Sequence, residues 1–381
     1  MAIWKSIVSL FHRESTEDYF PLNRLPDIPR IMIIRLIDVP EQVKLALSSK
    51  KMEGYMKIAK IQKFEYTEIS IGTEDFTIQV NDKFQIFDYK EQGNRREMEP
   101  WLNKDSSMLE NAVSVLKRFQ STFPCKETGV VIRVKEPTEI KYILDALDYF
   151  IFVSLKNVEL EAKTVDLVME TFKKGREIKI DGPVMPLDYS HPNAFQFDIV
   201  IYKDARWVRL EHLLSMKDIF GVELGKNNFK SEDLNALLKY WTTNDERMTC
   251  ALQIDITNET DIQKEVVLDG LTVLITCRLG HFIRFLANHR KQFLLNVSWD
   301  SESFTVYTFP LAEYSTPGKN KISFAREYRV LEILQKKKDL EDNLENGEDR
   351  DGMEDKIRGV EEELARNGVY YVEGTPHIDY E

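Results

Sequence analysis

FPLNRLPDIPRIMIIRLIDVPEQVKLALSSKKM, residues Phe20–Met52, is the stretch that most strongly decides how this chain is organised. The Leu25-Pro26 pair precedes a predicted helix whose apolar residues surround almost its whole circumference. These residues are Ile28, Ile31, Met32, Ile33, Ile34, Leu36 and Ile37. One stripe, such as Ile33 and Ile37 at the i, i+4 spacing, can pack on the following helices. The other apolar residues have no partner within so short a segment, which indicates a surface kept for another protein.

The order of these features resembles an F-box, the three-helix motif that docks on the Skp adaptor of a cullin-RING ubiquitin ligase. The likeness is carried by Phe20-Pro21, the Leu-Pro pair, two apolar helices, and Ser49-Lys50-Lys51 at the start of a third helix. The resemblance implies an F-box over residues 20–65. It also implies that the following residues contact the adaptor: Leu22, Leu25, Pro26, Ile33, Ile34, Ile37, Val43, Leu45 and Leu47.

The segment departs from the family at two prolines. Pro29 falls inside the expected first turn, and Ile37–Pro40 stands where the family prefers Asp-Pro. Pro29 is tolerable because first-turn N–H groups need no partner within the helix, and Asp27 is placed to cap them. These residues also leave open an ordinary N-terminal helical hairpin that is buried against its own chain.

The composition describes a folded intracellular protein. The 381 residues are 43% hydrophobic and 11% aromatic, enough for two or three domains with a substantial core. No stretch approaches the ~20 apolar residues of a membrane-spanning helix, and the first residues lack the features of a secretory signal. Three widely spaced cysteines fit reduced thiols, and the net charge of −12 argues against nucleic acid as a partner. The acidity instead favours, weakly, basic protein partners.

Strands and helices are predicted to alternate along most of the chain. A β-rich connecting region, residues 66–100, carries the strands Phe64–Ile71, Phe76–Val80 and Phe84–Tyr89, the last two joined across Asn81-Asp82. Predicted helices follow at Met108–Phe119, Thr138–Tyr149, Lys163–Lys173, Val208–Met216 and Glu232–Trp241. Predicted strands lie at Val130–Val134, Ile151–Leu155, Glu177–Ile180, Ile199–Tyr202, Ile219–Leu224, Leu252–Ile256 and Leu271–Thr276. Strand starts recur at roughly 20–30 residues, which favours a degenerate leucine-rich-repeat-like α/β domain over residues 101–322. A compact α/β domain is the alternative.

A second resemblance lies between Tyr202 and Trp241, which is similar to the F-box-associated type 2 domain of the expanded nematode F-box families. It is carried by Trp207-Val208, Leu210, His212-Leu213-Leu214, Leu224, Asp233-Leu234-Asn235, Leu237-Leu238-Lys239 and Trp241. Leu234, Leu237, Leu238 and Trp241 share one helical face, so these matches indicate core positions. We expect Trp207 and Trp241 to be buried, with an interface anchor as the alternative.

The last part of the chain, residues 323–381, predicts a helical hairpin and a closing strand. Val330, Ile333, Leu340 and Leu344 have a heptad-like spacing, and Met353, Ile357, Val360 and Leu364 repeat it across an acidic loop. Gly368–Val372 is the predicted strand. This arrangement also fits the nematode family.

No motif for catalysis or metal binding is present. The six histidines have no metal-ligand spacing, and neither a glycine-rich phosphate loop nor a nucleophile motif occurs. Cys277 and His281 stand at i, i+4, but a predicted strand and Gly280 argue against a helical pair. His212 is expected to be a half-buried, hydrogen-bonded histidine. We expect no cofactor and no catalytic residue.

These features together predict a non-catalytic substrate-recognition subunit of a Skp–cullin–F-box ubiquitin ligase, in the cytoplasm or the nucleus. After an N-terminal arm, residues 1–19, the F-box would bind the adaptor and the α/β domain would bind a protein target. No nucleic-acid or membrane partner is expected. The alternative is a protein-interaction scaffold whose degenerate F-box does not engage a ligase; co-purification of an adaptor and a cullin distinguishes the two.

Overall fold

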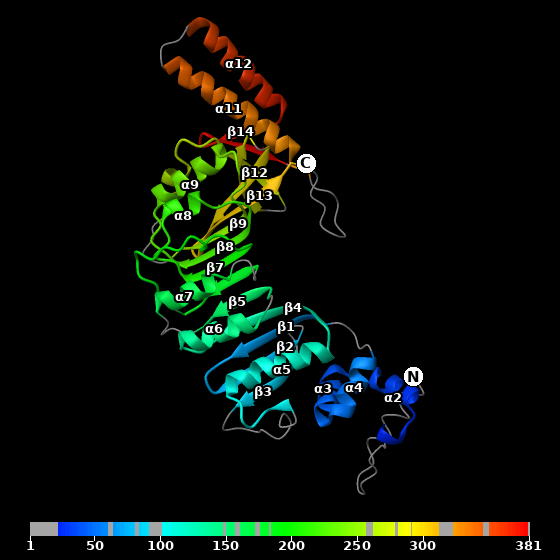
Figure 1. Ribbon diagram of the computed structural model, residues 1–381. Helices are drawn as coiled ribbons and strands as arrows, with labels where there is room; N and C mark the ends of the chain where they lie inside the picture. The colour runs from blue at the N-terminus through cyan, green and yellow to red at the C-terminus, as the bar shows by residue number, and fades with distance from the viewer. Residues whose placement is uncertain are drawn as a thin grey trace.

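The computed structural model describes residues 22–59, 64–80, 84–90, 101–147, 150–156, 161–171, 176–182, 184–256, 262–278, 281–290, 292–311, 323–345 and 350–379. The predicted N-terminal arm and the Phe20-Pro21 pair lie outside these residues. The described chain is a mixed α/β structure in which a group of N-terminal helices precedes one long sheet (Figure 1). None of its helices is long and apolar enough to cross a membrane.

The N-terminal group begins with a short 3-10 turn, η1 (Leu22–Arg24), and continues with α2 (Asp27–Ile34), α3 (Val39–Ser48) and α4 (Lys50–Ala59). Asp38 caps α3, because its side chain accepts a hydrogen bond of 3.1 Å from the backbone N–H of Glu41. Pro40 lies in the first turn of α3, where its missing N–H removes no helical hydrogen bond.

Two details of α2 differ from the sequence predictions. The chain leaves the helix after Ile34, so Ile33 and Ile37 do not form a stripe of one helix. Asp27 does not cap α2; its carboxylate pairs with Arg30 at 3.2 Å and accepts a hydrogen bond of 2.8 Å from the Tyr55 hydroxyl. The interior of the helical group is formed by Ile34, Val43, Ala46, Leu47, Met52, Met56 and Ala59, all of them buried.

The described strands belong to one fifteen-stranded sheet, in the order β14-β15-β10-β11-β12-β13-β9-β8-β7-β6-β5-β4-β1-β2-β3. The strands are β1 (Phe64–Ile71), β2 (Asp75–Val80), β3 (Phe84–Lys90), β4 (Cys125–Ile132), β5 (Phe152–Leu155), β6 (Glu177–Ile180), β7 (Ile199–Asp204), β8 (Ile219–Lys226), β9 (Thr249–Asp255), β10 (Leu274–Arg278), β11 (His281–Asn288), β12 (Phe293–Trp299), β13 (Ser303–Pro310), β14 (Val369–Val372) and β15 (Thr375–Asp379). The hairpin turn predicted at Asn81-Asp82 lies outside the described residues.

From β5 to β9 each strand is parallel to its predecessor in the sequence and lies directly beside it. The helices of this part are α5 (Met108–Thr122), α6 (Pro137–Ala146), α7 (Ala162–Met169), α8 (Leu210–Leu214), α9 (Ser231–Thr243) and α10 (Lys264–Leu268). Figure 1 shows α6 to α9 along one side of the strands. Ser107 and Glu110 begin α5 with a capping box, in which each side chain bonds the other residue's backbone N–H.

The sheet changes character after β9. Strands β10 to β13 form an antiparallel meander that brings β13 beside β9, and β15 adds to β10. The hairpin of α11 (Ala325–Glu345) and α12 (Arg350–Arg366) packs on this part. On β11, Phe285 and Ala287 face the α11 cluster, whereas Leu286 between them faces the main core. The helix α11 therefore covers the face of the sheet opposite to α9.

Both tryptophans of the segment that resembles the nematode family are core residues, as predicted. Trp207 and Trp241 are among the largest fully buried side chains. The Trp207 ring meets Tyr189 edge-on with ring centroids 5.0 Å apart. Near Trp241, the side-chain amide of Asn288 donates to the backbone oxygens of Trp241 and Asn244, at 2.8 and 3.0 Å. The amide thus ties the end of α9 to β11.

Most predicted elements between Phe64 and Ile256 overlap observed ones, and the C-terminal hairpin and closing strand are confirmed. Strands β1 to β3, predicted as a connecting region, are part of the same sheet as the rest. The strands β11, β12, β13 and β15 were not predicted from the sequence. These strands add an antiparallel section to the sheet, which the predicted alternation of strands and helices did not indicate.

Glu53 of α4 joins the N-terminal helices to the sheet. Its carboxylate accepts hydrogen bonds of 2.6 and 3.0 Å from Arg118 of α5, and it lies 3.0 Å from Lys57 Nζ. The Arg118 guanidinium also covers the Trp101 ring, 4.5 Å from its centroid. Burial acts to raise the pKa of the Glu53 carboxyl, but the hydrogen bonds from Arg118 and Lys57 outweigh burial and hold that pKa below its ordinary value.

Replacing Glu53 with Gln should lower the free energy of unfolding by about 2 kcal/mol at neutral pH, because Arg118 loses its counter-charge at a largely buried junction. The folded-state pKa of Glu53 is lowered, so its stabilising effect is complete above the ordinary carboxyl value of 4.5 and is lost as the pH falls through the folded-state pKa. Urea unfolding at neutral and acidic pH should therefore show that the difference in free energy of unfolding between the wild type and the Glu53→Gln variant becomes smaller in acid.

The matched control is Glu65→Gln, which breaks the exposed pair of Glu65 with Lys126 at 2.9 Å. Exposed pairs contribute little, so this change should cost less than about 0.5 kcal/mol. Equal stabilities for the two variants at neutral pH would contradict the role given to Glu53.

Candidate interaction surfaces

An apolar stripe on α2 is the first exposed surface. Ile28 and Met32 are 74% and 60% exposed, and their i, i+4 spacing within α2 places them on one side of the helix; Leu36 is also 63% exposed. Leu36 follows the end of α2 in a turn closed by a hydrogen bond of 2.9 Å to the Ile33 carbonyl. Ile34, on the other side, is fully buried. The predicted surplus of apolar surface on this helix is thus confirmed.

The structure divides the residues predicted to contact an adaptor into three groups. Ile34, Val43 and Leu47 are buried in the interior of the N-terminal helices. Pro26 is exposed. The other residues are half-buried, namely Leu22, Leu25, Ile33, Ile37 and Leu45. The three buried residues cannot reach a partner without opening their own core, so their part in docking is to support the surface.

The most exposed apolar residues of α2 were not among those assigned from the family resemblance. Ile28, Met32 and Leu36 were noted only as members of an unusually apolar helix. The four-residue spacing of Ile28 and Met32 is the signal that could have identified them as one surface. Arg35 fixes this end of α2 on α4, because its Nε donates a hydrogen bond of 2.7 Å to the Ala59 carbonyl.

The open face is the second exposed surface; it is the side of the sheet opposite the helices that cover β4 to β9 (Figure 1). Strand register aligns its side chains in two rows. The first row is Glu68, Gly129, Phe152, Glu177, Ile199, Gly221, Ala251 and Tyr307, and the second is Ser70, Val131, Ser154, Lys179, Ile201, Glu223, Gln253 and Thr305. Within the second row, Val131 and Ser154 are buried. Alternate residues of the same strands, such as Ile178 and Val200, are buried against the helices.

Two aromatic rings lie together at the β1 end of the open face. Tyr66 and Phe152 stack with ring centroids 6.0 Å apart and an interplanar angle of 22°. Gly129 of β4 lies beneath them, and a Cβ atom there would overlap the Phe152 ring and the Tyr66 hydroxyl oxygen. The absence of a side chain at Gly129 therefore allows the two rings to meet above β4.

Carboxylates flank this aromatic pair. The Tyr66 hydroxyl donates a hydrogen bond of 3.1 Å to Glu68, and Glu127 is the register partner of Tyr66. On the other side of the aromatic pair, Glu177 of β6 is the register partner of Phe152 of β5. Burial raises the pKa of the Glu177 carboxyl; Lys179 acts against this rise and Glu223 adds to it.

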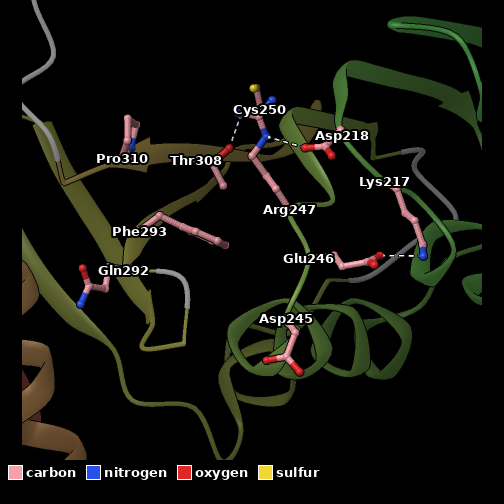
Figure 2. A pocket seen from close by; sticks show the side chains of 10 residues that line it. All are labelled: Lys217, Asp218, Asp245, Glu246, Arg247, Cys250, Gln292, Phe293, Thr308 and Pro310. Carbon is pink, nitrogen blue, oxygen red and sulfur yellow. Dashed lines mark hydrogen bonds and ion pairs between the residues drawn. The ribbon is translucent and has the colours of Figure 1, made fainter.

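A hollow of about 530 Å³ lies where the turns before β8 and β9 meet the ends of β12 and β13 (Figure 2). Its lining consists of Lys217, Asp218, Asp245, Glu246, Arg247, Cys250, Gln292, Phe293, Thr308 and Pro310. Lys217 pairs with Glu246 at 2.7 Å, and Arg247 with Asp218 at 3.4 Å. Asp245 pairs with Arg290 at 3.1 Å. Since these charges are paired with one another, the hollow offers a ligand no uncompensated charge.

The described residues do not form a catalytic or metal-binding group at the positions considered from the sequence. Cys277 and His281 belong to two strands of one hairpin, so the helical i, i+4 geometry does not occur. His212 is half-buried, and its Nδ1 accepts a hydrogen bond of 3.1 Å from the Arg209 backbone N–H. Burial and the charge of Arg209 lower its pKa, while Glu211 acts in the opposite direction. No cluster of His, Cys, Asp and Glu suited to a metal ion occurs in the described part of the chain.

No family model matches the chain, and no curated protein and no solved structure matches it. The α2 stripe and the open face are accordingly the basis for assigning a function.

Changing Gly129 to Ala should lower the free energy of unfolding by about 1–3 kcal/mol, because the added methyl group forces the Tyr66 and Phe152 rings apart. Urea unfolding measures the loss, and near-ultraviolet circular dichroism reports the changed aromatic packing.

Gly221→Ala is the matched control, since Gly221 lies on the same row of the open face and an added Cβ would meet nothing within 4 Å. This variant should unfold like the wild type or be slightly more stable. A Gly129→Ala protein with unchanged stability and spectrum would show that the ring pair does not need the glycine.

Proposed function

We propose that this protein is the substrate-recognition subunit of a Skp–cullin–F-box ubiquitin ligase, acting in the cytoplasm or the nucleus. In this proposal α2 to α4 dock on the Skp adaptor and the sheet binds a protein target. The observation that carries the proposal is the α2 stripe, because Ile28 and Met32 on the helix and Leu36 in the turn after it are large apolar side chains exposed to solvent.

Two resemblances in the sequence support the same assignment. The Leu-Pro pair and Ser-Lys-Lys of the N-terminal segment are similar to an F-box, and Tyr202–Trp241 is similar to the nematode F-box-associated type 2 domain. The neighbour-to-neighbour order of β4 to β9 is what a degenerate leucine-rich-repeat-like domain would have. An all-parallel sheet usually has helices on both faces, and a stack with one bare face fits such a repeat better than a doubly wound domain.

The proposed activity needs no catalytic residue in this chain. A receptor accelerates ubiquitin transfer by holding the target near the conjugating enzyme, which raises the effective concentration of target lysines. A receptor of this kind must keep a defined geometry between its adaptor surface and its target surface. The Glu53–Arg118 hydrogen bonds provide such a connection between α4 and α5 of the sheet domain.

The alternative function is a protein-interaction scaffold whose degenerate F-box does not engage a ligase. The same α2 stripe would then bind a different helical partner. A purified Skp-type adaptor and a cullin decide between these functions, because only the receptor should recover both in a pull-down.

Changing Ile28 and Met32 together to Glu should abolish recovery of the adaptor. Both residues are largely exposed, so the charges cost little folding stability, whereas two lost apolar anchors at an interface cost about 4 kcal/mol, or about a thousandfold in Kd. Truncating Ile33 and Ile34 would be a weaker test, because Ile34 is fully buried and its loss would destabilise the helices themselves.

Val184 and Leu187, 63% and 61% exposed between β6 and β7, provide the matched control. Changing both to Glu should leave adaptor binding within twofold of the wild type. Recovery of the adaptor by the Ile28/Met32 variant at the wild-type level would refute docking through α2, and failure of the wild-type protein to bind it would favour the scaffold.

A further inference from the structure

The β1 end of the open face combines aromatic and acidic side chains in one small area. Tyr66, Glu68, Glu127, Phe152 and Glu177, here called the cation site, come from the adjacent strands β1, β4, β5 and β6. The stacked rings of Tyr66 and Phe152 form its centre, and the three carboxylates lie around them in register. Glu68 is held by the hydrogen bond from the Tyr66 hydroxyl.

The three carboxylates form no ion pair with another described residue, although Lys179 lies near enough to Glu177, and Lys126 to Glu127, to act on them electrostatically. The basic side chains that lie nearest in strand register either pair with other residues or lie in the second row of the open face. Lys179 lies one row away from Glu177, beside Ser154, and Lys203 pairs with Glu223 on β8. Lys126 pairs with Glu65 at 2.9 Å, and both side chains are exposed. The cation site therefore has a local excess of negative charge.

The environment of Glu177 increases the energetic advantage of binding a cation. Its carboxyl lies between Phe152 and Ile199 in the row, and burial there raises its pKa because the charged form is poorly solvated. A positive group placed beside it would restore part of the lost solvation. Aromatic faces also attract a guanidinium or ammonium group, most strongly when carboxylates are near to hold it.

We infer that the cation site binds basic side chains of an extended, arginine- or lysine-containing segment of the protein target. This inference rests on the proposed function, since it specifies the chemistry of the target that the open face would hold. Glu68 and Glu177 are three strand spacings apart, roughly 14 Å, which matches two side chains four positions apart in an extended segment. The overall charge of −12 favours approach of such a segment and opposes nucleic acid.

The test uses the full chain without an adaptor and measures fluorescence anisotropy of a labelled glycine–serine peptide that carries two arginines four positions apart. Binding at low ionic strength is expected, with weakening as salt rises. The same peptide with glutamate in place of arginine should not bind. Changing Glu68, Glu127 and Glu177 together to Gln should weaken binding of the arginine peptide by about tenfold.

A charge-matched control separates the cation site from general attraction to an acidic protein. Glu211, Glu345 and Glu362 are exposed on helices, and changing all three to Gln alters the net charge by the same amount. This control should bind the arginine peptide within twofold of the wild type. The variant Phe152→Leu keeps an apolar side chain but removes the ring, and it should bind about threefold more weakly.

Three outcomes would overturn the inference: no binding of the arginine peptide by the wild type, equal binding by the cation-site variant, or an equal loss in the charge-matched control. Thermal melting of each variant identifies any loss that comes from unfolding. Adaptor docking is measured separately and involves α2, so loss of peptide binding with retained adaptor recovery would reject the cation site alone. Loss of adaptor recovery with retained peptide binding would reject the proposed function instead.

Discussion

From β6 to β9 the strands bury alternate side chains against helices on one face of the sheet, and this one-sided burial governs the rest of the molecule. Ile178, Val200, Val222 and Leu252 fill the helix side, and the residues between them face outward. Because each strand lies beside its predecessor, each added unit extends the same apolar layer. The open face is the direct consequence. It is large and varied in chemistry, and its backbone is fixed by ladders of hydrogen bonds, so it presents side chains in defined rows.

The two exposed surfaces depend on different kinds of contact. The α2 stripe stands on a small apolar interior around Ile34, and that interior is attached to the sheet through the charged junction at Glu53. The cation site instead depends on a missing side chain at Gly129, which lets Tyr66 and Phe152 meet. Both surfaces are thus controlled by residues beneath them that a partner would not touch.

The periodicity of apolar residues in the sequence was sufficient to predict the elements whose buried side chains follow a simple repeat. Glu177–Ile180 and Phe64–Ile71 were predicted with the bounds that the structure has, because alternation of apolar residues marks a half-buried strand. The meander from β11 to β13 was missed although its strands pair with their neighbours in the sequence, because β12 buries consecutive residues and shows no simple alternation; only the pairing of β13 with β9 is long-range. Periodicity marked Phe64–Ile71 as an alternating strand, but it could not indicate that no helix covers the open face. The apolar residues of α2 were recognised from the sequence. Which of them face inward depends on where the helix ends, and the structure buries Ile34 rather than Ile33.

The short strand β14 at one end of the sheet affects how the molecule behaves at high concentration. A strand at the edge of a sheet has unpaired backbone groups that can recruit the edge of a second molecule and begin aggregation. Here the edge strand is only Val369–Val372, and the Lys337 ammonium group of α11 lies 5.4 Å from the centre of the Tyr371 ring. A length of four residues and a neighbouring positive charge both disfavour edge-to-edge pairing. The Lys337 ammonium group of the α11–α12 hairpin thus adds to the short length of β14 in disfavouring the addition of a strand from a second molecule at this edge of the sheet.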